Sequence, residues 1–132
     1  DERARAFAFS FLQRAAQEPG AVQTSSGLVF RTLTPGTGAQ PKASDVVRVH
    51  DHGTLPGGKI FDSSVDRGEP AEFRLSQVIP CWTEGVQRMH VGEKAELVCP
   101  SAIAYGDRGA GGVIPPGATL VFEVELLAIK TP

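Results

Sequence analysis

Hydrophobic and polar residues alternate along several short stretches of the chain, and a period of two is typical of strands with one buried face. In residues 120–127, the apolar positions Leu120, Phe122, Val124 and Leu126 alternate with Val121, Glu123, Glu125 and Leu127. In residues 46–52 the same alternation places Asp51 on the face of Val47 and Val49, opposite Arg48, His50 and His52. With turn residues between them, these patterns predict strands over 28–33, 46–52, 71–75, 93–99 and 120–127, and a strand start at 59–61.

Two stretches have a helical period instead. Residues 3–18 lack glycine and proline and space Phe7, Phe11 and Ala15 by four, before Pro19-Gly20 ends the pattern. Residues 81–89 predict a second, short helix. The whole pattern predicts an α+β domain, in which an antiparallel β-sheet wraps around a short α-helix and an N-terminal helix precedes it.

A loop over residues 100–119 is rich in glycine and carries Tyr105. Long ordered loops in small domains are uncommon and tend to carry function. Apolar and aromatic residues elsewhere fit an ordinary core, but Trp82 and Tyr105 also carry polar atoms that need partners when buried. We therefore expect a concave apolar pocket built from several elements: Phe61, Val78, Ile79, Trp82, Tyr105, Ile114 and Phe122.

Composition narrows the classes of function. The 132 residues fit one domain, and a net charge of -2 gives no electrostatic case for binding nucleic acid or an anionic membrane. No apolar run is long enough for membrane insertion, and no signal-peptide pattern is present. Cys99 is in phase with Ala95 and Leu97, so we expect it to be a small buried side chain, with a disulfide to Cys81 as the less favoured alternative.

Six segments in collinear order resemble the FKBP-type peptidyl-prolyl isomerases. They are Val49-His50, Lys59-Ile60-Phe61-Asp62-Ser63-Ser64, Val78-Ile79-Pro80-Cys81-Trp82, Ile103-Ala104-Tyr105-Gly106, Val113-Ile114-Pro115-Pro116-Gly117 and Val121-Phe122-Glu123-Val124-Glu125. The N-terminal helix and Ser26-Gly27-Leu28-Val29-Phe30 are similar to the Mip/FkpA branch of Gram-negative bacteria. The resemblance implies that residues 21–132 form an isomerase domain that needs no cofactor or metal.

For residues 1–20 the resemblance implies a truncated linker to a dimerisation module, so that the full-length protein would be a homodimer. A helix that packs on its own domain is the alternative, because Phe9 and Leu12 widen its apolar face. The branch also implies a periplasmic location, with the cytoplasm as the alternative. Proline-containing polypeptides are the partners implied, and tacrolimus or rapamycin the inhibitors.

The resemblance also assigns roles in a pocket for proline. Phe61, Trp82 and Phe122 match the aromatic walls and floor. Val78 and Ile79 match the shoulder, where the Ile79 N–H binds a carbonyl, and Tyr105 matches a hydroxyl donor to the other carbonyl. Ile114 would close one side, and Asp62 would form the polar edge with Arg67 as its ion partner. From the residues alone, Asp62 before Ser63-Ser64 is more typical of a turn aspartate.

This chain departs from the family at several positions, and Asp51 matters most. The family's Val-His-Tyr motif reads Val49-His50-Asp51 here, so a carboxylate replaces a pocket tyrosine and would repel Asp62 if both ionised. We expect lowered isomerase activity; a proline-binding chaperone with little turnover and an unused pocket are the alternatives. A metal site using Asp51, Asp62 and histidine is disfavoured, because His50 and His52 face the other way. Further departures are Ala71, Ala110 and Cys81.

Overall fold

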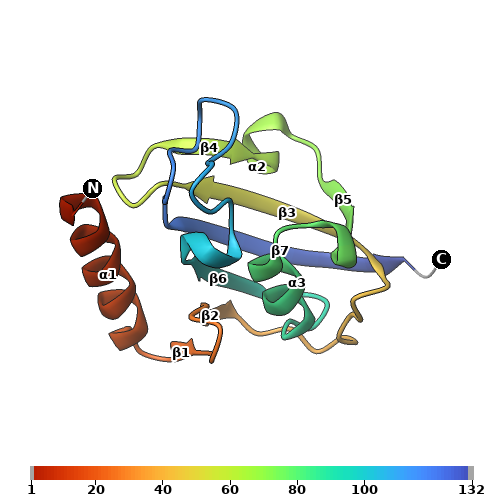
Figure 1. The fold of residues 1–132 in the computed structure, drawn as a ribbon. Coiled ribbons are helices and arrows are strands. Elements are labelled where there is room, and N and C mark those ends of the chain that lie inside the picture. Colours follow the sequence, from red (N-terminus) through yellow and green to blue (C-terminus); the bar gives the residue numbers. More distant parts are fainter. Residues whose placement is uncertain (1, 131–132) are drawn as a thin grey trace.

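The computed structural model of the protein describes residues 2–130. Within them, seven strands form one antiparallel sheet in the order β1-β2-β6-β7-β3-β4, and β5 also pairs with β3 (Figure 1). The strands are β1 (Val22–Gln23), β2 (Val29–Thr34), β3 (Val46–Thr54), β4 (Ile60–Ser63), β5 (Ala71–Arg74), β6 (Lys94–Cys99) and β7 (Leu120–Lys130). The helices are α1 (Glu2–Gln17), α2 (Ser64–Arg67) and α3 (Pro80–Gln87), with 3-10 turns η1 (Leu75–Gln77) and η2 (Ser101–Ile103). The expected α+β architecture is confirmed.

Two short strands share one edge of β3. The first part of β3 pairs with β5, from Val46 opposite Arg74 to Val49 opposite Ala71. The last part pairs with β4, where Gly53 lies opposite Asp62. The chain must therefore turn beside the middle of β3, and α2 fills this turn. This arrangement brings the end of β4 and all of α2 close to Asp51.

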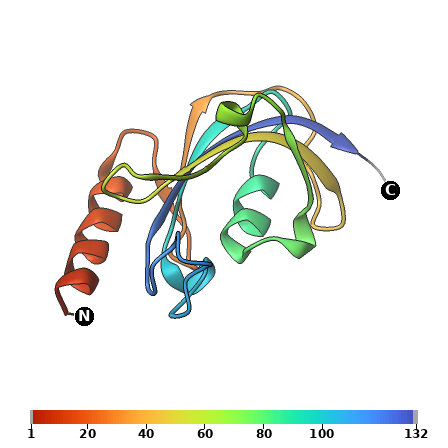
Figure 2. The same ribbon diagram turned by 90° about the horizontal axis from the view of Figure 1, so that it is seen from above.

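Helix α3 lies on the concave face of the sheet, where the core is formed (Figure 2). Gly85 allows the close approach, because a Cβ atom there would collide with the side chain of Leu97 on β6. Val47, Val49 and Asp51 point to this face, as the alternation predicts, and all three are buried. The fully buried core side chains include Leu28, Leu75, Val86, Met89, Leu97, Leu120, Val124 and Leu126.

Helix α1 lies on the other side of the sheet from α3 (Figure 2). It has no buried residue, and Phe7 and Phe9 are 55% and 63% exposed. Its inner side, at Phe11 and Ala15, borders a shallow groove against the outer face of β6 and β7. The expected helix is thus confirmed, and Phe7 and Phe9 remain largely open to solvent.

A disulfide joins Cys81 and Cys99, whose Cα atoms are 5.9 Å apart. The disulfide, which was the less favoured alternative, is the one that the structure shows, and the predicted burial of Cys99 is confirmed. Cys81 lies in the first turn of α3 and Cys99 is the last residue of β6, so the packing of helix on strand brings them together. The bond ties the start of α3, next to Trp82, to the sheet.

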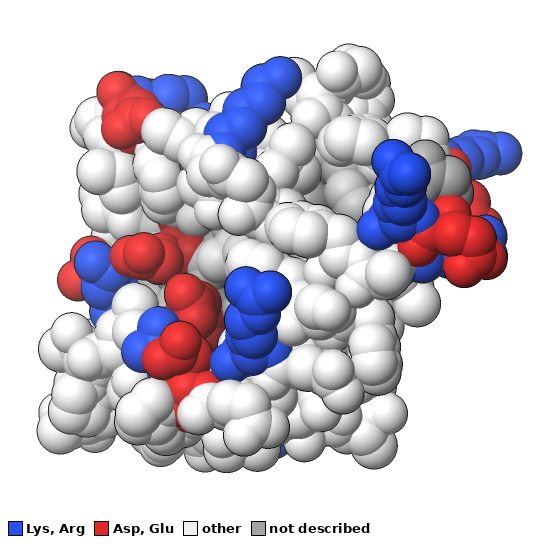
Figure 3. Space-filling view, turned by 90° about the vertical axis from the view of Figure 1, so that its left-hand side faces the viewer, with Lys and Arg blue, Asp and Glu red and all other residues white. Residues whose placement is uncertain are grey.

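The face that Figure 3 shows has no large patch of charged side chains of one sign. Acidic and basic side chains lie beside one another there, and most of that face is uncharged. Across residues 2–130, none of the helices has both the length and the apolarity needed to cross a bilayer.

Candidate functional site

A cavity of about 480 Å³ opens between α3, β5, the end of β4 and the glycine-rich loop. The residues that line it are Asp51, Asp62, Phe73, Gln77, Val78, Ile79, Trp82, Tyr105 and Phe122. Seven of them were expected from the sequence, and Phe73 and Gln77 were not. The structure therefore brings the separate sequence segments to one site.

Edge-to-face aromatic contacts form the wall of the cavity. Trp82, in the first turn of α3, packs against Phe73 on one side and Phe122 on the other, each with ring centroids 5.4 Å apart. The ring of Phe61 packs edge to face on Phe122 in the same way, with ring centroids 5.5 Å apart. Such geometry adds stabilisation beyond burial and fixes the rings relative to one another. The wall is therefore a preformed apolar surface.

Phe61 and Ile114 were expected in the wall of the pocket but are not among the residues that line the cavity. Phe61 lies across Gly53 of β3, where any Cβ would meet its ring. Ile114 is 6% exposed and belongs to the core cluster. Phe61 therefore packs on the wall through the ring of Phe122, and Ile114 is part of the buried core.

Sequence reasoning missed Phe73 and Gln77. A signal existed for Phe73, because it shares one face of the expected strand with Ala71 and Leu75, and Leu75 is buried. Gln77 lies in η1, a 3-10 turn with no periodic pattern of its own. Only the packing of η1 beside α3 places it at the cavity.

Hydrogen-bonding groups lie at the rim. The carbonyl of Ile79 accepts from the N–H groups of Trp82 at 2.9 Å and Thr83 at 3.1 Å, whereas its own N–H donates to no acceptor within residues 2–130. Tyr105 also lines the cavity and is 39% exposed, in a loop that turns at Gly109 with φ of +67°. The Trp82 Nε1 is buried and has no partner in the described chain. The rim can therefore offer donors to a ligand's carbonyl groups.

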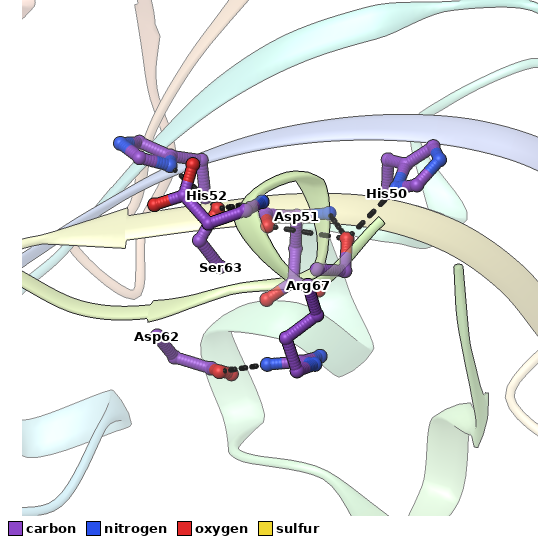
Figure 4. Close-up of polar contacts among 8 residues, drawn as sticks. His50, Asp51, His52, Asp62, Ser63 and Arg67 are labelled. Carbon is purple, nitrogen blue, oxygen red and sulfur yellow. Dashed lines mark hydrogen bonds and ion pairs between the residues drawn. The ribbon is translucent and has the colours of Figure 1, made fainter. Parts of the chain in front are cut away.

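An ion pair closes the polar edge. Arg67 donates to Asp62 Oδ1, as expected, and both side chains are about half exposed (Figure 4). Asp62 is not the turn residue that the sequence alone also allowed, because Ser63 caps α2 by accepting from the N–H of Asp66 at 3.1 Å. An exposed pair of this kind contributes little to stability. Its main effect is to hold the Asp62 carboxylate at the cavity.

Asp51 is the unusual member of the site. It is 2% exposed, and its Oδ1 has no hydrogen-bond partner within residues 2–130. Its side chain leaves β3 toward the Asp62–Arg67 pair, whereas His50 and His52 lie on the other face (Figure 4). Burial, and then the charge of Asp62, raise the pKa of Asp51, and Arg67, Ser64 and His50 offset this in part.

The two histidines make hydrogen bonds with serines and not with the Asp51 and Asp62 side chains. His50 Nδ1 lies 3.0 Å from Ser64 Oγ, and His52 Nδ1 lies 2.8 Å from Ser63 Oγ. Within residues 2–130, no three histidine, cysteine or acidic side chains are grouped so that they could hold a metal ion. The arrangement is that of a pocket for an organic ligand with one apolar and one acidic side.

We expect Asp51→Asn to make the protein more stable at about pH 7 than the parent. A folded-state pKa above the unfolded value means that ionising Asp51 costs native stability, and this cost disappears as pH falls through the raised pKa. The stability difference should therefore close toward about pH 4, near the ordinary pKa of aspartate. Melting temperatures across this range measure it, with exposed Asp107→Asn as the matched control. Equal melting temperatures for parent and Asp51→Asn at every pH would contradict the account.

Comparisons with known proteins agree with this geometry. Residues 37–127 match the model of the family described as FKBP-type peptidyl-prolyl cis-trans isomerase. FkpA of Aeromonas hydrophila is 57% identical over 122 residues, which are 92% of this chain and 45% of the relative. The FKBP-type 22 kDa peptidyl-prolyl cis-trans isomerase of Escherichia coli (strain K12) is 55% identical over 119 residues, 90% of this chain and 58% of the relative.

A solved structure shows the same fold. The crystal structure of FkpA from Escherichia coli superposes with a TM-score of 0.94 at 46% identity, over 98% of this chain and 60% of that one. The chain thus spans about half the length of the curated relatives it matches. The resemblance to the bacterial FkpA branch is confirmed, and the chain belongs to the FKBP-type peptidyl-prolyl cis-trans isomerase family.

Proposed function

We propose that this chain is a peptidyl-prolyl cis-trans isomerase domain that accelerates rotation about X–Pro bonds in unfolded or extended polypeptides. The observation that carries the proposal is the cavity itself, in which Trp82, Phe73 and Phe122 form a fixed aromatic wall beneath a rim of free donors. A proline ring is compact and apolar, and the carbonyl groups on either side of it need donors such as the Ile79 N–H and the Tyr105 hydroxyl.

The reaction suits such a pocket. Rotation of a peptide bond faces a barrier of about 18–20 kcal/mol, and the uncatalysed X–Pro bond takes tens of seconds or more. No bond is broken, so the chain needs neither a nucleophile nor a leaving group. An apolar cavity disfavours the charge-separated planar amide relative to the twisted one, and fixed donors add selective stabilisation. Lowering the barrier by about 5–7 kcal/mol would accelerate rotation by about four to five decades.

A proline-binding chaperone with little turnover is the second candidate, and Asp51 is the observation that favours it. A buried carboxyl beside the catalytic wall replaces an aromatic side chain and places a second acid near Asp62. A carboxylate at position 51 leaves the aromatic wall available to bind a proline ring but lowers turnover. We therefore propose that activity is present but reduced.

A chymotrypsin-coupled assay with a proline peptide that has an apolar residue before proline tests the proposal. We expect acceleration above the uncatalysed rate, inhibition by tacrolimus or rapamycin, and loss of at least about tenfold in Trp82→Ala, since the wall is truncated. Asp107→Asn serves as the control for an exposed position. Tacrolimus binding without acceleration would favour the chaperone. No acceleration and no binding at high micromolar ligand would show that the pocket is not a prolyl site.

We also propose that residues 21–132 form the isomerase domain and residues 1–20 link it to a second module, through which the full-length protein forms a homodimer. Asp1 and residues 131–132 lie outside the described residues. The support is that α1 leaves Phe7 and Phe9 exposed and that the matched relatives are longer than this chain. Sedimentation of the full-length protein should give a dimer, and a monomer at micromolar concentration would contradict the proposal.

A periplasmic location is proposed as well, with the cytoplasm as the alternative. The Cys81–Cys99 disulfide supports it, because disulfides persist in oxidising compartments such as the bacterial periplasm. Thiol alkylation of acid-quenched cells should leave both cysteines unlabelled. Labelling of both would favour the cytoplasm.

A further inference from the structure

The Asp51 carboxyl has one buried oxygen, Oδ1, for which the described residues provide no hydrogen-bond partner. Asp51 as a whole is only 2% exposed, and it lines the cavity. A buried polar atom without a partner costs roughly 1–3 kcal/mol. Folded proteins satisfy nearly all such atoms, so an exception that faces a binding cavity points to a partner on the ligand.

The groups around Asp51 determine which protonation state faces that ligand. Asp62 on β4 raises its pKa, while Arg67 on α2 and His50 on β3 lower it. Among its other neighbours, its register partner on β7 is the uncharged Val124, α3 and β5 contribute the rings of Trp82 and Phe73, and the loop contributes Tyr105. Since burial is the largest influence, the neutral acid is favoured relative to an exposed aspartate.

A neutral carboxyl in an apolar pocket is a hydrogen-bond donor. In the planar X–Pro amide the nitrogen lone pair is delocalised and accepts no hydrogen bond. In the twisted amide the lone pair is localised on nitrogen and becomes an acceptor. A donor aimed at this nitrogen therefore makes its bond mainly in the transition state, and such bonds raise kcat.

We propose that protonated Asp51 is a catalytic residue of this chain, which donates a hydrogen bond to the prolyl nitrogen of the twisted X–Pro amide. The inference rests on the proposed isomerase function. The proton stays on Asp51 throughout, so no covalent bond forms or breaks. A tyrosine at this position would present a donor at every pH below about 10, whereas aspartate does so only while it is protonated. Isomerase activity should therefore fall as pH rises.

The test is a protease-free pH profile of kcat/KM, from about pH 4.5 to about pH 8.5, with a blocked Leu-Pro peptide that has no ionisable side chain. The native chain should lose about tenfold activity per pH unit above the pKa of Asp51. Asp51→Asn keeps an N–H donor and should give a flat profile, and Asp51→Leu should be low at every pH. Asp62→Asn removes a charge that raises the Asp51 pKa, so its midpoint should move to lower pH.

Carboxyl carbon NMR of Asp51 provides an independent readout, because the midpoint of its titration should coincide with that of the activity profile. Circular dichroism at each pH confirms that every variant is folded. A native chain that is active with a flat profile overturns the inference and leaves the isomerase function intact. Absence of activity in the native chain, Asp51→Asn and Asp51→Tyr at all pH values overturns both.

Discussion

Asp51→Tyr should raise kcat/KM for proline isomerisation by about ten- to a hundredfold at neutral pH. Removing one fixed transition-state donor costs an enzyme about two to three decades, and the tyrosine hydroxyl remains protonated where the native aspartate loses its proton. The ring would also extend the wall that Trp82, Phe73 and Phe122 already form. The gain should be larger at alkaline pH than at acidic pH.

Asp51→Phe is the matched control, because it adds the ring without the hydroxyl. If tyrosine and phenylalanine raise the rate equally, the aromatic wall is the cause and the donor is not. An unchanged or lower rate in Asp51→Tyr would show that our account of this position is wrong. Melting curves of both variants exclude a difference that arises from misfolding.

Reducing the Cys81–Cys99 disulfide should lower the free energy of unfolding by about 3 kcal/mol. The two cysteines are 18 residues apart, and this is the loop-closure value for a loop of about that length. For a domain of this size that corresponds to about 10 °C in melting temperature. Both cysteines are fully buried, so the disulfide must be reduced in mild denaturant, which is then removed. The measurement is urea unfolding with and without reductant.

The double variant Cys81→Ala/Cys99→Ala is the control for this measurement. It should have lowered stability that reductant does not change further. If reductant leaves the unfolding midpoint of the native chain unchanged after full reduction is verified by mass, the disulfide does not stabilise the fold as proposed. Activity should fall with reduction as well, because Trp82 follows Cys81 in the first turn of α3.

Local patterns were sufficient to predict the longer elements of the fold. The alternation in β3 and β7 has a period of two, and it correctly placed Asp51 on the buried face and His50 and His52 on the other. The N-terminal helix begins and ends within one residue of its expected bounds. Four short elements were not predicted, because none is long enough to show a period: β1, α2 and the 3-10 turns η1 and η2.

Tertiary packing determines what the sequence could not show. The disulfide depends on the approach of α3 to β6, which Gly85 permits, and no sequence spacing encodes that distance. Phe61 and Ile114 have the residue types of a pocket wall, but whether such side chains line the cavity depends on how their neighbours pack. Gln77 likewise reaches the site only through a 3-10 turn.

Exchange NMR spectroscopy of a blocked Leu-Pro peptide measures the rotation itself, without a protease. With a substoichiometric amount of the native chain, cis and trans proline resonances should exchange well above the uncatalysed rate. Tacrolimus should suppress this acceleration, and Asp51→Tyr should increase it. A peptide exchange rate that the native chain and Asp51→Tyr both leave unchanged would contradict the claim that this cavity is an isomerase site.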